Sequence, residues 1–122
     1  MTNANEGLDH VGFGVADQAA SIAWYSDLLG LERVHEAEWG NTPAMLLGPV
    51  TRNGVALFQA GDHHAVGFHH VAFRVTAADF AAARERLEAD GTPYDFHDHV
   101  AAHSIYLRDP DGVMVELTTY EV

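Results

Sequence analysis

A single carboxylate in an apolar strand is the first feature of this 122-residue chain that could do chemistry. Glu116 lies between Val115 and Leu117, in the second arm of a β-hairpin predicted over residues 104–118. The turn between the arms reads Asp-Pro-Asp-Gly at residues 109–112, where proline presets φ and glycine accepts a positive φ. A buried carboxylate without a partner is unfavourable, so Glu116 is either solvated or paired with a cation, and a metal ion is one such cation.

Histidine is the second residue type that could do chemistry. The chain has nine histidines and no cysteine. Imidazole binds metals and exchanges protons near neutral pH, whereas the lack of cysteine excludes disulfides, thiolate catalysis and zinc-finger sites. The histidines are His10, His35, His63, His64, His69, His70, His97, His99 and His103.

The charge of the chain excludes one class of partner. Eighteen acidic residues against six arginines give a formal net charge of −12. A nucleic-acid partner is not expected, because phosphate binding needs a basic face. The acidic surface favours solubility or reflects adaptation to salt. We recognise no signal peptide and no segment of transmembrane length, so we expect a cytoplasmic protein with no membrane partner.

An internal repeat organises the chain. Residues 8–15 match residues 68–75 at an offset of 60, and residues 54–58 match residues 112–116 at an offset of 58. Between these matches, each copy has a helical stretch that ends in glycine. Landmarks in the same order indicate two copies of one unit. We expect a single domain, residues 1–122, in which module one covers 7–60, a polar joint covers 61–66 and module two covers 67–120.

Each module is predicted to read βαβββ, which gives an α+β fold class. The helices are expected to begin near Asp17 and Thr76 and to end at Gly30 and Gly91. The remaining strands are predicted at residues 32–38, 44–47 and 55–59, and at 94–96, 104–107 and 113–118.

The first strand of each module alternates with period two. One face carries apolar residues, such as Val11 and Phe13 in the first copy. The other face carries His10, Gly12 and Gly14 in one copy and His70, Ala72 and Arg74 in the other.

This arrangement resembles the vicinal oxygen chelate superfamily. That group includes glyoxalase I, fosfomycin thiol transferases, methylmalonyl-CoA epimerase, extradiol ring-cleavage dioxygenases and bleomycin-binding proteins. The resemblance runs from Leu8 to Tyr120 and rests on LDHV at residues 8–11, HHVAF at 69–73 and LRDPDG at 107–112. It implies a glyoxalase/dioxygenase-like fold, in which two βαβββ modules form a bowl-shaped mixed sheet with a divalent metal on its concave side.

The resemblance implies His10, His70 and Glu116 as metal ligands. The residues themselves agree, because both histidines lie opposite the apolar stripes and beside Gly12 and Ala72, which leave room for a ligand. Two imidazoles and one carboxylate, with open positions, suit Fe(II) in oxygen chemistry or Mn(II) as a Lewis acid.

A fourth ligand is not expected. Glyoxalase I and the epimerase place Glu or Gln at the first-copy position equivalent to Glu116. The offset of 58 puts Phe58 there, and bringing the adjacent Gln59 inward would flip the whole strand. We therefore expect a three-ligand site with Phe58 as a substrate contact, which counts against both of those enzymes.

Four further residues are expected to take part in catalysis. Tyr106 lies ten residues before Glu116, a spacing found in the dioxygenases and fosfomycin enzymes, where that Tyr points at the metal-bound substrate. His64 lies in a segment that resembles the one before the metal-bearing strand in ring-cleaving enzymes. His97 and His99 resemble their active-site loop, where histidine would move protons. The alternatives are a core tyrosine and surface histidines.

Arg74 is expected to face the substrate two positions beyond Ala72. It would hold a carboxylate or phosphate of the substrate, or else pair with an acidic residue of the chain. Fosfomycin enzymes use a basic cluster and a Thr two residues after the first ligand, where this chain has Gly12. Fosfomycin modification is therefore not expected.

Together these features predict a small metal-dependent enzyme that is extradiol-dioxygenase-like and acts on a small molecule that chelates the metal through adjacent oxygens. One alternative is an isomerase or lyase of the glyoxalase or epimerase type. Another is a non-enzymatic drug-binding protein of the bleomycin-binding type, although such proteins lack the metal triad. A homodimer is expected, with the modules paired within one chain or between chains.

Overall fold

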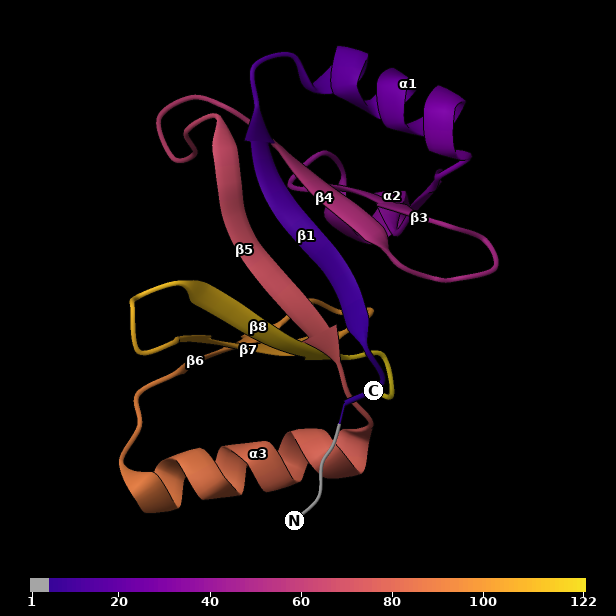
Figure 1. Cartoon of the computed structure of the whole chain (residues 1–122). Coiled ribbons are helices and arrows are strands. Elements are labelled where there is room, and N and C mark those ends of the chain that lie inside the picture. The colour runs from indigo at the N-terminus through magenta and orange to yellow at the C-terminus, as the bar shows by residue number, and fades with distance from the viewer. Residues whose placement is uncertain (1–4) are drawn as a thin grey trace. The chain divides into compact units, whose positions relative to one another are not determined.

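The computed structural model describes residues 5–122, which form three helices and eight strands (Figure 1). The expectation about a signal peptide concerns in part residues 1–4, which lie outside the described residues. The strands are β1 (Leu8–Val15), β2 (Glu32–Val34), β3 (Ala44–Leu47), β4 (Gly54–Gln59), β5 (Gly67–Arg74), β6 (Asp95–Asp98), β7 (His103–Arg108) and β8 (Met114–Thr119). The helices are α1 (Gln18–Leu29), α2 (Glu36–Trp39) and α3 (Ala77–Asp90).

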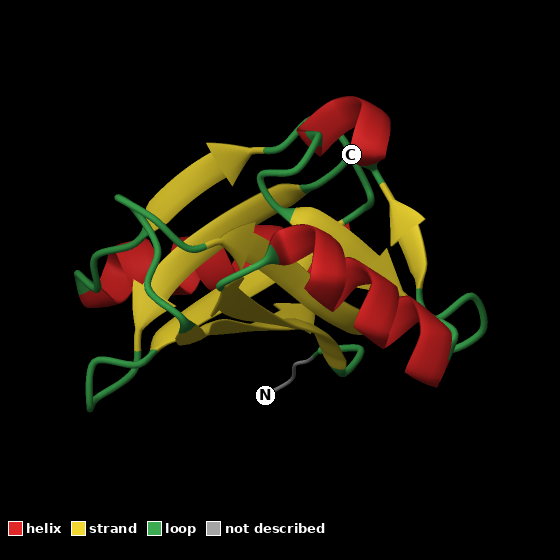
Figure 2. Ribbon diagram, turned by 90° about the horizontal axis from the view of Figure 1, so that it is seen from above, coloured by secondary structure: helices red, strands yellow, loops and turns green. Residues whose placement is uncertain are grey.

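The chain divides into two compact units. One is Asp9–His70, and the other combines Val71–Val122 with Leu8 and the described residues before it. The division falls inside β1 and inside β5. In each unit a long helix lies against one face of the strands (Figures 1 and 2). The predicted α+β class is confirmed, and the second copy has the predicted βαβββ order, whereas the first copy has an additional short helix, α2, between its second and third strands.

The unit Asp9–His70 has the strand order β2-β3-β4-β1. The pair β1/β4 is parallel, with His10 opposite Gly54, and the other pairs are antiparallel. A buried cluster of Ala44, Leu46 and Leu57 packs under α1. Phe13 of β1 and Ile22 of α1 pack against it, so the predicted apolar stripe of the first strand faces the helix.

The opposite face of the same strands is also apolar. Met45, Leu47 and Ala56 are buried there and pack against Val34, Trp39 and Phe58. The predicted strand over residues 32–38 is wrong beyond Val34. His35 adopts a left-handed conformation, with φ of 59°, and the chain turns into α2. The Glu-Ala-Glu sequence has low strand propensity, and the turn brings Trp39 onto the apolar cluster.

The second unit has the strand order β5-β8-β7-β6. The pair β5/β8 is parallel, with Ala72 opposite Glu116, and β8/β7 and β7/β6 are antiparallel. Val75, Phe80 and Ile105 form the core under α3, and Leu87 and Leu117 pack against them. Burying a side chain such as Phe80 contributes ~2–3 kcal/mol, which fixes α3 on this face of the strands.

The helix ends follow the sequence prediction. Asp17 accepts a hydrogen bond from the Ala20 backbone N–H at 3.1 Å, and Thr76 accepts one from Asp79 at 3.1 Å. Gly30 and Gly91 end α1 and α3 in the left-handed region, with φ of 68° and 71°. A residue with a Cβ is strained in that region, so glycine is favoured at both ends.

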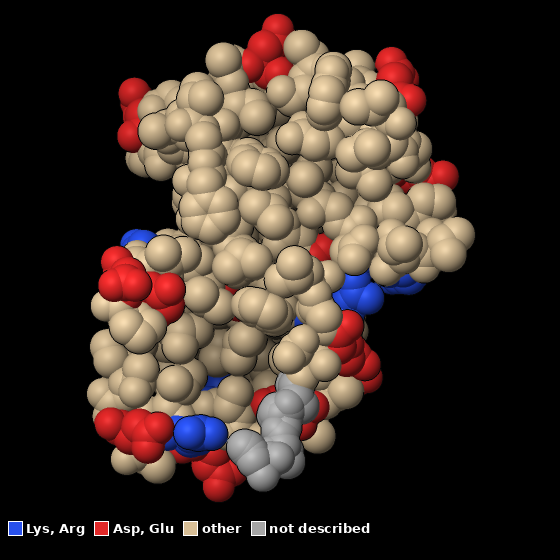
Figure 3. All heavy atoms as spheres, in the orientation of Figure 1, with Lys and Arg blue, Asp and Glu red and all other residues tan. Residues whose placement is uncertain are grey.

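Acidic side chains are scattered over the face of the molecule drawn in Figure 3. At a net charge of −12 their mutual repulsion opposes compaction at low ionic strength. None of the helices described for residues 5–122 is both long and apolar enough to span a membrane.

The cap of α1 gives a stability prediction. Asp17→Ala removes the acceptor for the Ala20 N–H and should lower the free energy of unfolding by about 1 kcal/mol in urea denaturation. Asp27→Ala is the matched control, because Asp27 is an exposed acid on the same helix near its C-terminal end. Equal effects of the two substitutions would contradict the capping role.

Candidate metal centre

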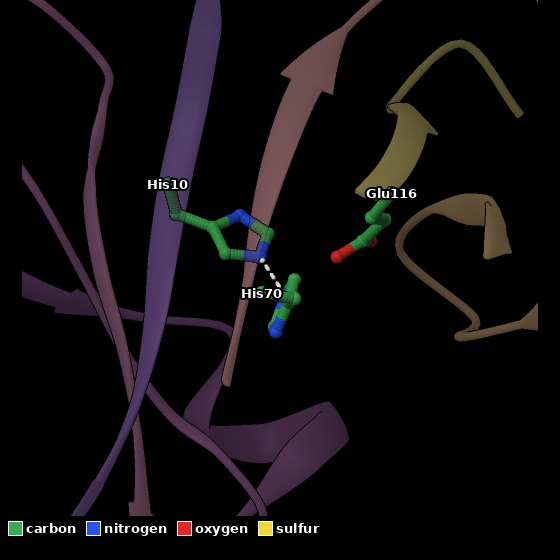
Figure 4. A group of neighbouring side chains, drawn as sticks. All are labelled: His10, His70 and Glu116. Carbon is green, nitrogen blue, oxygen red and sulfur yellow. Dashed lines mark hydrogen bonds between the residues drawn. The ribbon is translucent and has the colours of Figure 1, made fainter. Parts of the chain in front are cut away.

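Two histidines of the unit Asp9–His70 meet through their ring nitrogens. His10 on β1 is 5% exposed and His70 on β5 is 2% exposed. Their Nε2 atoms lie 3.0 Å apart, and the ring planes are 85° from parallel (Figure 4). This is a hydrogen-bond distance, and it is also short enough for both nitrogens to bind one metal ion.

The second nitrogen of each ring has a partner of its own. His10 Nδ1 lies 2.7 Å from Asp9 Oδ2, and because a carboxylate only accepts, Nδ1 carries the hydrogen and donates it. His10 Nε2 therefore has a lone pair available to a metal. His70 Nδ1 lies 2.8 Å from Nδ1 of His69. The imidazole of His69 is therefore the hydrogen-bond partner of His70, as the carboxylate of Asp9 is that of His10. Fixing the second nitrogen orients a metal-binding histidine and selects its tautomer.

Gly12 provides the space that the His70 ring occupies. A Cβ at Gly12 would lie 2.4 Å from both Cε1 and Nδ1 of His70, which is closer than real contacts allow. Gly12 follows His10 by two residues and shares its face of β1. The sequence expectation that Gly12 leaves room for a ligand matches this contact.

The carboxylate is held by a hydroxyl on the neighbouring strand. Glu116 on β8 is 3% exposed, and Ser104 Oγ on β7 donates to its Oε2 at 2.7 Å. Ser104 Oγ also lies 3.1 Å from Thr118 Oγ1. Glu116 is opposite Ala72 in the β5/β8 ladder, and His70 precedes Ala72 by two residues on the same face of β5.

His10, His70 and Glu116 are the group of buried potential metal ligands found among the described residues (Figure 4). Two imidazoles and a carboxylate are a donor set that Fe(II) and Mn(II) accept, and the three ligand atoms lie within 4.8 Å of one another. The residues present therefore fit a divalent metal of this kind.

Tyr106 lies directly across from Glu116 in the β7/β8 ladder. Its hydroxyl is hydrogen-bonded to Nε2 of His99 at 2.9 Å, and the His97 ring stacks on the His99 ring at 5.7 Å. The structure thus brings together three of the residues expected to act in catalysis. Burial, followed by the charge of Glu116 and a hydrogen bond to it, raises the pKa of Tyr106 well above its usual value. Tyr106 is therefore a neutral phenol around pH 7.

The fourth expected catalytic residue lies beside Phe58. The His64 ring stacks on Phe58, with centroids 4.3 Å apart and planes 16° from parallel. Phe58 also meets His69 at 5.0 Å and the edge of His70 at 6.2 Å. Arg74 is half-buried on β5 opposite Thr118, on the same face as Ala72.

The strand registers correct one equivalence drawn from the sequence. Ala72 is opposite Glu116 in the β5/β8 ladder, and Gly12 is opposite Ala56 in the β1/β4 ladder. The first-copy counterpart of Glu116 is therefore Ala56 and not Phe58. Both side chains lie on the same strand face, and both are apolar, so the expectation of three ligands is unaffected.

Gln59 is occupied elsewhere. Its Nε2 donates to the Ala16 carbonyl at 2.7 Å, and its Oε1 accepts from the Gln18 backbone N–H at 2.9 Å. Gln59 thus ties β4 to the beginning of α1, and it is on the strand face opposite to Phe58.

Three supporting residues were missed in the sequence. Asp9 and His69 each directly precede a ligand, so the pairs Asp-His and His-His were the available signal. Ser104 had no comparable signal, because its contact with Glu116 depends on the register of β7 against β8.

The chain belongs to the Glyoxalase/Bleomycin resistance protein/Dioxygenase superfamily, whose family model matches residues 7–117. A curated relative, glutathione transferase FosA of Serratia marcescens, is 30% identical over 115 residues, which are 92% of this chain and 79% of that protein. The predicted resemblance to this superfamily is confirmed.

Solved structures agree with the fold. Methylmalonyl-CoA epimerase from Mycobacterium tuberculosis has a TM-score of 0.75 at 28% identity, covering 98% of this chain and 91% of that one. A catechol 2,3-dioxygenase has a TM-score of 0.66 at 14% identity, covering 96% of this chain but 42% of the dioxygenase. The chain thus spans less than half the length of that dioxygenase, and this second likeness concerns the fold alone.

The contact at Gly12 gives a prediction for metal binding. Gly12→Ala should displace the His70 ring and weaken Mn(II) binding at least tenfold in a chelator competition, because the new Cβ overlaps that ring. Gly61→Ala is the matched control, since a Cβ at Gly61 meets nothing within 4 Å. Unchanged affinity in Gly12→Ala would contradict the assignment of His70 as a ligand.

Proposed function

We propose that this protein is a metal-dependent enzyme in which His10, His70 and Glu116 hold Fe(II) or Mn(II). Its substrate is a small molecule that chelates the metal through adjacent oxygens, and the reaction is of the extradiol-dioxygenase type. The observation that carries the proposal is the hydrogen bond between Tyr106, which lies on the strand beside Glu116, and His99, which lies in the turn after β6.

The bound metal would supply a Lewis-acid and redox centre with open positions for substrate and oxygen. The protein's contribution is to hold the donor atoms. Asp9 keeps the hydrogen of His10 on Nδ1 and leaves Nε2 for the metal, and Ser104 fixes one oxygen of Glu116. A carboxylate among the ligands also offsets one of the two positive charges.

Tyr106 and His99 would donate a hydrogen bond to the substrate and transfer protons. A phenol with a raised pKa donates a hydrogen bond to a substrate oxygen and does not act as a base at neutral pH. His99 Nε2, already hydrogen-bonded to that hydroxyl, can exchange a proton with it. The His97 ring stacks on the His99 ring and is exposed to solvent, so it would link this hydrogen-bonded pair to the solvent.

Phe58, His64 and Arg74 would contact the substrate. The stacked rings of Phe58 and His64 form a flat wall beside His70, which suits a planar organic ligand. Arg74 would hold an acidic group on that ligand.

An isomerase of the epimerase type is the second candidate, supported by the 28% identity to the mycobacterial methylmalonyl-CoA epimerase. Removing a proton next to a carbonyl requires a base near the substrate. On the β3/β4 face beside Phe58, Met45, Leu47 and Ala56 offer none, so a histidine such as His64, which stacks on Phe58, would have to take this role. The hydrogen-bonded pair of Tyr106 and His99 is the observation that favours the dioxygenase type. The drug-binding alternative and the homodimer stay predictions.

Metal loading and oxygen consumption test the proposal. Protein loaded anaerobically with Fe(II) should retain about one metal per chain and take up oxygen with members of a catechol panel. His70→Ala and Glu116→Gln should lose both properties, because each removes a ligand or weakens its charge. Full metal occupancy without oxygen uptake, together with epimerisation of an acyl-CoA, would replace the dioxygenase type by the isomerase. Absence of metal from the wild type would reject the site.

Tyr106→Phe gives an independent prediction. Loss of the hydroxyl should lower kcat for oxygen uptake by about a hundredfold or more while metal content is unchanged, because the phenol contacts substrate and not metal. Tyr94→Phe is the matched control, since the Tyr94 hydroxyl contacts Arg84 and Glu88 at α3. Equal rates for Tyr106→Phe and Tyr94→Phe would contradict the role of Tyr106.

A further inference from the structure

We propose that Asp9 is a positioning residue of the metal centre, which holds His10 in the one tautomer and ring orientation that presents Nε2 to the metal. The inference rests on the ligand assignment made under the proposed function. It concerns a residue that touches neither metal nor substrate and acts through its hydrogen bond to His10.

Burial is the first observation that supports this role. Asp9 is 0% exposed, and its Oδ2 lies 2.7 Å from Nδ1 of His10, which is itself 5% exposed. A carboxylate removed from water costs several kcal/mol unless a hydrogen-bonded cationic or polar group compensates it. The imidazole N–H gives this compensation directly, and a metal on the far nitrogen would make that N–H more positive.

The position of Asp9 in β1 is the second observation. Side chains alternate across a strand, so Asp9 belongs to the row of Val11 and Phe13 and not to the row of His10. Phe13 of that row packs on the core under α1. An apolar residue would therefore serve the fold at position 9. A carboxylate stands there instead, and its Oδ2 reaches Nδ1 of His10.

The partners of the other two proposed ligands differ from Asp9 in charge. His70 Nδ1 meets a second imidazole, that of His69, and Glu116 meets the Ser104 hydroxyl. Of these three contacts, the contact of Asp9 is the one that brings a full negative charge to a ligand. A carboxylate behind an imidazole both orients the ring and makes it a stronger donor to the metal.

The experiment compares Asp9→Asn with Asp27→Asn. Both remove one negative charge from the same unit, but Asp27 is exposed on α1, which packs on the opposite face of the strands from His10. We expect Asp9→Asn to weaken Zn(II) and Mn(II) binding 10–100-fold in chelator competition, with Asp27→Asn close to wild type. Asp9→Glu, which keeps the charge, should recover part of the affinity. Circular dichroism without metal checks that each variant folds.

A spectroscopic measurement on the wild type makes the test independent of variant folding. In protein loaded with diamagnetic Zn(II), long-range ¹⁵N–¹H spectra should place the metal on Nε2 of His10 and a slowly exchanging hydrogen on Nδ1. Zinc on Nδ1, or the absence of that hydrogen, would overturn the inference, as would equal metal affinity in Asp9→Asn and Asp27→Asn. A wild-type protein that binds no metal would instead reject the proposed site itself, and the role of Asp9 with it.

Discussion

The parallel pairing of the first and last strands of each copy is the constraint on which the rest of the structure depends. Strands β1 and β4 pair in this way in one unit, and β5 and β8 in the other. Parallel neighbours cannot be joined by a tight turn, so a long connection must intervene, and in each copy it contains a long helix and two further strands. The same pairing brings Glu116 beside Ala72, two residues from His70, although these residues are far apart in sequence.

The two units share this plan but differ on the strand face that their long helix leaves uncovered. In the unit Asp9–His70, the face opposite α1 is filled by Met45, Leu47 and Ala56 and is covered in part by Trp39 of α2. In the other unit, buried Ser104, Glu116 and Thr118 alternate with the residues that pack under α3. One topology thus places apolar side chains of β3 and β4 on this face in one copy and polar side chains of β7 and β8 in the other, and the chemistry depends on side chains and not on the fold.

Much of this could be predicted from sequence, because the repeat, the caps and the alternation are local signals. Asp17, Thr76, Gly30 and Gly91 act at the helix ends as expected. The register of β4 could not be predicted. Shifting a strand by two residues keeps every side chain on its own face, so the match of residues 54–58 to 112–116 looked sound although it was displaced. Only the ladder hydrogen bonds distinguish Ala56 from Phe58 as the counterpart of Glu116.

The missing side chain at Gly12 limits the symmetry of the repeat. Its counterpart in the second copy is Ala72, and an alanine at position 12 would overlap the His70 ring. The first strand of the second copy therefore cannot replace that of the first without a shift of His70, even though both strands contain a His-Val pair. The space left by Gly12 and the ring of His70 are complementary. A chain built from two identical copies would need a different packing at this point.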